Sequence, residues 1–185
     1  MSKVKVEEIY GHQFFSVDKV IQSVLPPPKG GIWPLLVPDF PVKKVLILGF
    51  GAGSVAKAIL EKSPDCEILG LDYNEEMLEE ARKQNFPPKL KLIRQDIFDF
   101  LDSYQDKFDY VCVDLFEGHW FPVRLLQGET LAKLKDLVAK GGKLAINLPD
   151  FPKLWNSNFK MKVEKVLSPE MKASANLVVW AVDSE

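Results

Sequence analysis

The sequence predicts an α/β fold in three layers, with a mostly parallel seven-stranded sheet, an antiparallel edge hairpin and a short N-terminal β extension. Three observations lead to this prediction. Short apolar runs alternate with segments whose apolar residues follow helical spacing, which is typical of a parallel sheet covered on both faces. Gly49, Gly51 and Gly53 join the first such run to the first such segment. The last two apolar runs have no helical segment between them, which indicates the edge hairpin.

The composition is that of an ordinary globular protein. The 185 residues are enough for one domain with a substantial core, and 46% of them are hydrophobic while 27% are charged. The formal net charge of −2 gives no reason to expect nucleic acid or a membrane surface as a partner. Cys66 and Cys112 lie in apolar runs and are predicted to be core residues. Because no segment resembles a signal peptide or a membrane span, a cytoplasmic location is expected.

The first 40 residues are predicted to form a β extension and a linker, ahead of a main domain over residues 41–185. Residues 1–25 alternate apolar and polar side chains, with turns expected at Gly11-His12 and Asp18-Lys19. The linker is rich in proline and glycine, and four of its apolar side chains can pack on the main domain: Trp33, Leu35, Leu36 and Val37. The early strands could also pair across a homodimer, because a lone hairpin is only marginally stable.

The main domain is predicted as strands and helices in alternation. Strands are expected at residues 45–48, 67–71, 89–94, 110–114, 143–147, 170–175 and 177–182. Helices are expected at residues 54–62, 75–83, 97–104, 129–140 and 158–167. Asn74 is expected to cap the second helix, and Glu75 and Glu76 suit its positive end. Gly141 and Gly142 are a stop signal for the fourth helix.

The glycine-rich turn and the acid that follows it predict a nucleotide-type site. A strand, a glycine turn and a helix let the backbone approach a ligand, and the helix N-terminus points free N–H groups at it. Asp72 lies at the end of the next apolar run, where an acid would meet ribose hydroxyls. The glycines are spaced G-x-G-x-G rather than G-x-G-x-x-G. The alternative is a tight strand-to-helix turn without a ligand.

Two further strand ends carry polar side chains, and ligands of open parallel sheets bind beyond such ends. Asp96, after Gln95, could accept a hydrogen bond from an adenine amino group, or could cap the following helix. Asp114 and Glu117 could orient an amine and take its proton, although Glu117 could equally be a solvated loop residue. The loop at residues 119–122, His-Trp-Phe-Pro, could exclude water from the site or simply pack. No His/Cys cluster has metal-ligand spacing, so no metal is expected.

At this point the sequence resembles a known family. Residues 47–54, Ile-Leu-Gly-Phe-Gly-Ala-Gly-Ser, are similar to motif I of class I S-adenosylmethionine-dependent methyltransferases, which implies their three-layer Rossmann-like methyltransferase fold. Within that superfamily the sequence looks closest to spermidine synthase-like proteins. Three further stretches carry this resemblance: residues 17–22, residues 95–100, and a run from Asp114 through Gly141-Gly142 to Asn147.

The resemblance implies a donor site and an acceptor. The donor would be S-adenosylmethionine or decarboxylated S-adenosylmethionine, and the acceptor a small molecule such as an amine. The implied donor-binding residues are Gln22, Gly49, Gly51, Gly53, Asp72, Tyr73, Gln95, Asp96 and Asp114. Asp114 would also be the catalytic aspartate, with Glu117 in place of the family's second acid.

The sequence departs from the spermidine synthases at two positions. Lys19 stands where they usually have glycine, and the segment from Pro26 to Trp33 lacks their Tyr-His-Glu. We therefore favour methyl transfer, with aminopropyl transfer from decarboxylated S-adenosylmethionine as the alternative. A non-catalytic nucleoside-binding relative is a further alternative. A nicotinamide-dependent oxidoreductase is disfavoured by Gly53 and by the lack of a substrate domain.

Overall fold

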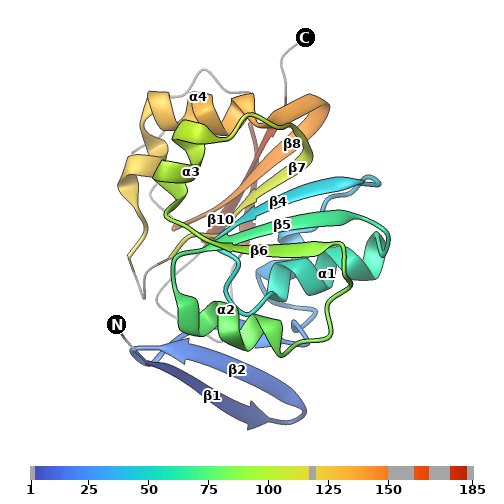
Figure 1. The fold of residues 1–185 in the computed structure, drawn as a ribbon, viewed down its shortest axis with the longest axis vertical. Coiled ribbons are helices and arrows are strands. Elements are labelled where there is room, and N and C mark those ends of the chain that lie inside the picture. Colours follow the sequence, from blue (N-terminus) through green and yellow to red (C-terminus); the bar gives the residue numbers. More distant parts are fainter. Residues whose placement is uncertain (1–2, 117–119, 150–160, 167–175, 183–185) are drawn as a thin grey trace.

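The computed structural model describes residues 3–116, 120–149, 161–166 and 176–182. These residues form a small antiparallel sheet, in the order β1-β2-β3, and a larger sheet in the order β6-β5-β4-β7-β8-β10-β9 (Figure 1). The larger sheet is parallel from β6 to β8, and β10 pairs antiparallel with both β8 and β9. The predicted α/β class, with a mostly parallel sheet and an antiparallel edge, is confirmed.

The strands are β1 (Val4–Ile9), β2 (His12–Val17), β3 (Val20–Leu25), β4 (Lys44–Leu48), β5 (Glu67–Asp72), β6 (Leu90–Arg94), β7 (Phe108–Val113), β8 (Val138–Pro149), β9 (Met161–Val166) and β10 (Asn176–Val182). The helices are α1 (Ser54–Lys62), α2 (Glu75–Arg82), α3 (Ile97–Ser103) and α4 (Gly128–Asp136), with 3₁₀ turns η1 (Trp33–Leu36) and η2 (Val123–Leu126). None of the helices in the described part of the chain has the length and apolar character that a membrane crossing requires.

The central strand β4 separates two apolar clusters, because successive side chains of a strand point to opposite faces. Val45 and Ile47 pack in one cluster with residues of α1, α2 and η1. Leu46 and Leu48 pack in the other with residues of α3 and α4. All four side chains are fully buried. The helices therefore cover both faces of the sheet, which leaves its carboxyl edge for the loops that follow β4, β5, β6 and β7 (Figure 1).

The N-terminal sheet is built from two hairpins with left-handed turn residues. Asp18 and Lys19 have φ angles of 50° and 68°, and Tyr10 and Gly11 have 51° and 78°. Positive φ at both central residues is typical of type I′ hairpin turns. The turn at Asp18-Lys19 was predicted, whereas the first turn falls one residue earlier than Gly11-His12. Lys19 thus adopts, with a side chain, a conformation that glycine adopts without strain.

The predicted fourth helix, residues 129–140, extends four residues beyond the observed C-terminal end. Helix α4 ends at Asp136, and the strand β8 already begins at Val138. Gly141 (φ 77°) and Gly142 lie inside β8, where its pairing with β7 is irregular. A Cβ on Gly142 would lie 2.7 Å from the Asp109 carbonyl oxygen. Gly142 therefore permits the close approach of β8 to β7, and Gly141 supplies a backbone with positive φ. Neither glycine caps a helix.

The predicted helix at residues 158–167 is also wrong. Residues 161–166 form the strand β9, which pairs with β10 from Met161 to Val166. Apolar and charged residues alternate from Met161 to Glu164, a period-2 pattern that fits a strand. The strand predicted at residues 170–175 lies outside the described residues. The one predicted at 177–182 is β10, which lies between β8 and β9.

The linker is fastened to the sheet by a buried hydrogen bond. The Tyr110 hydroxyl, on β7, donates to the Leu36 carbonyl oxygen at 2.5 Å, and both residues are fully buried. This bond joins residues 74 positions apart in the chain. The linker is therefore part of the core, as its apolar side chains predicted.

We expect Tyr110→Phe to lower the free energy of unfolding by about 1–3 kcal/mol, because it leaves a buried carbonyl oxygen without its donor. Denaturant unfolding monitored by circular dichroism measures the loss. Tyr104→Phe is the matched control, since the Tyr104 hydroxyl makes an exposed 3.3 Å bond to Asp106. Equal stability losses in the two variants would contradict the structural role of the Tyr110 hydroxyl.

Candidate functional site

The glycine turn after β4 lies at the carboxyl edge of the sheet and is held by backbone hydrogen bonds. Gly49 and Phe50 both donate their N–H to the Leu71 carbonyl oxygen, at 3.0 and 2.8 Å. Gly49, Gly51 and Gly53 have φ angles of 85°, 55° and 101°, a region that favours glycine. A Cβ on Gly49 would lie 2.2 Å from the Asp114 carbonyl oxygen. The turn thus brings the end of β4 against the end of β7.

Asp72, the last residue of β5, bonds directly to this turn. Its Oδ2 accepts the Gly51 N–H at 2.8 Å, and its Oδ1 accepts the Asn74 N–H at 2.9 Å. A carboxylate can accept about four hydrogen bonds, so Asp72 can accept more than these two. Burial raises the pKa of Asp72, while backbone hydrogen bonds from Asn74, Gly51 and Tyr73 oppose the rise. Asp72 is therefore an oriented carboxylate that has capacity left for a ligand.

The loop that follows β6 places Gln95 and Asp96 beside Asp72. The Gln95 N–H donates to the Asp72 carbonyl oxygen at 3.2 Å. Asp96 caps α3, because its Oδ1 accepts the N–H of Phe98 at 2.8 Å and that of Asp99 at 3.4 Å. The structure thus shows Asp96 as the N-cap of α3. Its Oδ2 takes no part in the capping. Tyr73 is exposed at the same edge.

Asp114 follows β7 and is paired with a buried amide. Asn147, on the neighbouring strand β8, donates from Nδ2 to Asp114 Oδ1 at 2.7 Å. Burial raises the pKa of Asp114 to about 6, against the lowering by hydrogen bonds from Asn147 and Trp33, and the negative charge of Asp72 adds to the rise. Asn147 is only 2% exposed, and its Oδ1 has no hydrogen-bond partner among the described residues.

The β extension reaches the glycine turn through β3. The Ser23 hydroxyl oxygen accepts the Ala52 N–H at 3.0 Å. The Ser54 hydroxyl both accepts from the Val24 N–H and donates to the Val24 carbonyl, each at 2.9 Å. The backbone carbonyl of Gln22 would lie 3.7 Å from a Cβ on Gly51, whereas the Gln22 amide donates to Val20 at 3.5 Å. Gln22 therefore approaches the turn with its backbone.

Sequence reasoning missed three residues of this edge: Ser23, Ser54 and Asn147. Ser23 and Ser54 pair with backbone groups 29 and 30 positions away, and no local pattern reports such a contact. For Asn147 a signal existed, because a polar residue at the end of an apolar strand needs a hydrogen-bond partner if it is buried.

The loop after Asp114 is described only in part. Glu117 and His119 lie outside the described residues. Trp120 is 80% exposed and fills no pocket, whereas Phe121 is buried in the apolar cluster beneath α3 and α4. The Phe121 ring packs edge-on against Phe116, with 5.8 Å between centroids. Phe121 thus fits the packing alternative for this loop.

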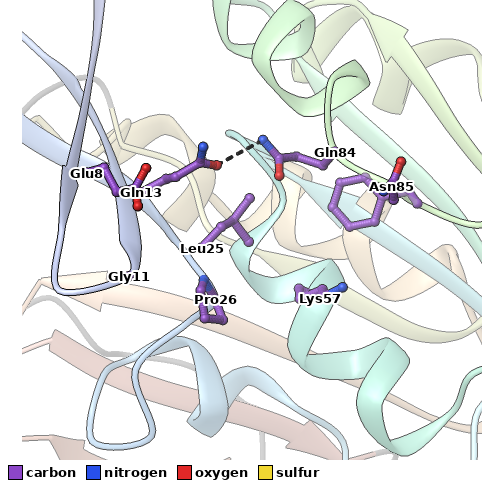
Figure 2. A pocket seen from close by; sticks show the side chains of 9 residues that line it. Glu8, Gly11, Gln13, Leu25, Pro26, Lys57, Gln84 and Asn85 are labelled. Atoms are coloured by element: carbon purple, nitrogen blue, oxygen red, sulfur yellow. Dashed lines mark hydrogen bonds between the residues drawn. The ribbon is translucent and has the colours of Figure 1, made fainter.

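A cavity of about 350 Å³ lies between the β extension and the main body. Figure 2 shows it between Gln13 and Leu25 on one side and Lys57 and Gln84 on the other, with the Gln84 amide donating to Gln13 at 3.4 Å. No predicted site residue lines it. Within the described residues, no group of three His, Cys, Asp or Glu side chains could hold a metal ion.

Comparison with known proteins assigns the chain to a family. A family model described as "Methyltransferase domain" matches residues 40–181, and the chain therefore belongs to this family. The resemblance read from the sequence, to class I methyltransferases and their spermidine synthase relatives, is confirmed.

Two kinds of relative share sequence with the chain. It is 32% identical over 114 residues to a trans-aconitate 2-methyltransferase of Sinorhizobium fredii (strain NBRC 101917 / NGR234), an alignment that covers 62% of this chain and 41% of the relative. It is 31% identical over 108 residues to a polyamine aminopropyltransferase of Korarchaeum cryptofilum (strain OPF8), which covers 54% and 33%. The matched region thus spans less than half the length of each relative.

A solved structure shares the fold over the whole chain. The crystal structure of a probable spermidine synthase from Corynebacterium glutamicum ATCC 13032 superposes with a TM-score of 0.79 at 17% identity. The match covers 100% of this chain and 78% of that one. At this identity the likeness is one of fold, and it includes the N-terminal sheet that precedes residue 40.

The raised pKa of Asp114 predicts a pH-dependent effect on stability. An acid whose pKa is higher in the folded chain than in the unfolded one destabilises the fold when ionised, and this penalty disappears as the pH falls through the folded pKa. With a folded pKa of about 6, we expect Asp114→Asn to be more stable than the wild type by about 2 kcal/mol at pH 8. The difference should shrink steadily between pH 7 and pH 4.

Urea unfolding at several pH values measures this difference, with Asp65→Asn as a control at an exposed acid. A stability gain for Asp114→Asn that stayed constant from pH 8 to pH 4 would contradict the assignment of a buried, titrating carboxyl.

Proposed function

We propose that this chain is a transferase that binds an S-adenosylmethionine-type donor at the carboxyl edge of the sheet and serves a small-molecule acceptor. The observation that carries the proposal is the carboxylate of Asp72, which backbone N–H groups including those of Gly51 and Asn74 orient, and which has acceptor capacity left for a ligand. Such a carboxylate at the end of β5, the second strand of the main domain, suits a pair of ribose hydroxyls. Membership in the methyltransferase-domain family supports the donor class.

The remaining donor contacts are assigned around Asp72. The backbone of Gly49, Gly51 and Gly53 would line the nucleoside and the sulfonium, with β3 and Gln22 closing over the turn. Asp96 Oδ2, Gln95 and Tyr73 are assigned to the adenine side, since Asp96 uses only Oδ1 to cap α3. We assign donor binding to residues 41–185 and the β extension to residues 1–40, a division supported by the family match that begins at residue 40.

Asp114 is assigned to the acceptor. The donor supplies a carbon made electrophilic by the attached sulfonium, and the chain must orient the acceptor and hold its proton. Asp114 suits this role because its pKa of about 6 leaves it ionised at neutral pH and still basic enough to take a proton. The half-buried carboxylates of Asp72 and Asp114 also favour a positive charge at this edge. Glu117 is proposed as the second acid.

Methyl transfer is the function that we favour, and aminopropyl transfer is the second candidate. The family description and the trans-aconitate 2-methyltransferase relative support methyl transfer. The polyamine aminopropyltransferase relative and the fold shared with a probable spermidine synthase support aminopropyl transfer, with decarboxylated S-adenosylmethionine as donor. A non-catalytic nucleoside-binding role would be favoured by a site plugged by Trp120 or Phe121, but Trp120 is 80% exposed and Phe121 is buried in the core.

A thermal-shift panel tests the donor. We expect S-adenosylmethionine or its decarboxylated form at 100 times its dissociation constant to stabilise the chain by about 2.7 kcal/mol, a rise in Tm of about 5–10 °C. Asp72→Ala should abolish this rise because it removes the ribose acceptor, whereas Asp65→Ala, at an exposed acid, should retain it. A rise in Tm with NAD and with neither adenosyl donor would contradict the proposal.

The leaving product distinguishes the two transfers. Methyl transfer leaves S-adenosylhomocysteine, whereas aminopropyl transfer leaves methylthioadenosine. We expect S-adenosylhomocysteine, measured by mass spectrometry, when the chain is incubated with S-adenosylmethionine and either trans-aconitate or a small amine as acceptor. With an amine acceptor, activity should fall as the pH drops through about 6, because protonated Asp114 cannot take the proton that the amine loses. Methylthioadenosine formed from the decarboxylated donor and a diamine would establish the second candidate instead.

A further inference from the structure

The contact between the β extension and the glycine turn places one hydroxyl group behind the donor site. Ser23 is 2% exposed, and its Oγ accepts the Ala52 N–H at 3.0 Å. The preceding N–H of the turn, that of Gly51, donates to Asp72 Oδ2 at 2.8 Å. The two N–H groups flank the Gly51 Cα, so one side of this glycine is bonded to the extension and the other to Asp72.

Gly51 needs such restraint because its backbone is free to adopt many conformations. Its φ angle is 55°, and glycine loses more conformational freedom on folding than any other residue. A Cβ on Gly51 would lie 2.5 Å from Ser23 Oγ, so the serine side chain occupies the space beside this Cα. Ser23 therefore limits the conformations of the turn both by its hydrogen bond and by its volume.

We propose that Ser23 is a positioning residue for the donor: it fixes the turn at Gly51 so that the Gly51 N–H aligns the Asp72 carboxylate with the ribose hydroxyls. The inference rests on the proposed function. Ser23 itself acts from behind the turn and is assigned no contact with the donor. It also lies before residue 40, where the family match begins, so this part of the donor site comes from outside the matched domain.

Neighbouring contacts hold Ser23 in place. The cluster of Phe15, Leu25, Ala52 and Met77 packs the extension against the turn and α2. The Val4 N–H donates to Glu76 Oε2 at 2.7 Å, which ties β1 to the same helix. Because these contacts and the Ser54–Val24 hydrogen bonds hold the extension independently of Ser23, loss of the serine hydroxyl leaves the extension docked and changes the turn itself.

The same interface provides a matched control. Ser54, the first residue of α1, makes two buried hydrogen bonds to the Val24 backbone. Ser54→Ala should lower Tm at least as much as Ser23→Ala, since it removes more hydrogen bonds. Ser54 bonds to β3 and not to a backbone group of the turn that leads to Asp72, so it should not affect the ribose contact specifically.

A thermodynamic cycle between protein and ligand tests the proposal. Isothermal calorimetry would measure the binding of S-adenosylhomocysteine and of its 2′-deoxy and 3′-deoxy analogues to the wild type, Ser23→Ala and Ser54→Ala. We expect Ser23→Ala to weaken the binding of S-adenosylhomocysteine by about 5–10-fold, and the binding of at least one deoxy analogue by less than about twofold. Ser54→Ala should weaken all three ligands by the same factor.

A second pair of variants separates the hydroxyl from the shape of the side chain. Ser23→Thr and Ser23→Val are isosteric and differ only in the hydroxyl group, so only the threonine variant should keep the preference for the complete ribose. This pair of variants also tests the proposal if the Ser23→Ala variant fails to fold. Equal weakening of all three ligands by Ser23→Ala, or identical affinities of the Thr and Val variants, would overturn the positioning role. If the wild type binds none of the three ligands, S-adenosylmethionine is not the donor, and the same cycle is measured with methylthioadenosine and its deoxy analogues; binding of neither set shows that the proposed donor class is wrong.

Discussion

The glycine turn between β4 and α1 is the constraint on which the rest of this structure depends. Its backbone N–H groups donate to three acceptors on two strands: the Leu71 carbonyl and the Asp72 carboxylate on β5, and the Ser23 hydroxyl on β3. Its three glycines have no room for side chains. A Cβ on Gly49, Gly51 or Gly53 would lie 2.2, 2.5 or 2.4 Å from an atom of Asp114, Ser23 or Phe86, respectively. The glycines are therefore required by packing alone, before any ligand is considered.

The electrostatics of the sheet edge follow from the same packing. The turn and the strands around it shield Asp72 and Asp114 from part of the solvent, and this desolvation raises the pKa of both carboxyl groups. Hydrogen bonds from the Gly51 and Asn74 N–H groups and from the Asn147 amide oppose the rise but do not cancel it. Partly dehydrated negative charge is stabilised by a nearby positive charge. An edge with this character suits a cationic donor better than an anionic one.

The β extension is an integral part of this site. It is a three-stranded sheet whose buried face packs on Ala52 and Met77, and one of its hairpins turns through Lys19 in a conformation that glycine adopts more readily. Lys19, one of the two departures from the spermidine synthases, thus lies in a turn with positive φ at both central residues. The strand β3 that follows this turn places Gln22 and Ser23 over the glycine turn.

The sequence by itself determined the order of the first strands and helices and the positions of Asp72, Asp96 and Asp114 at strand ends, because periodicity, caps and glycine turns are local properties. It predicted α1 without error and the boundaries of α2 and α3 to within one residue. Tertiary structure decided the rest. Strand β8 begins before the glycines that were taken as a helix stop, and residues 161–166 become a strand because β10 is there to pair with them. Ser23, Ser54 and Asn147 acquire their partners only when segments about 30 residues apart meet, and no local pattern records that distance.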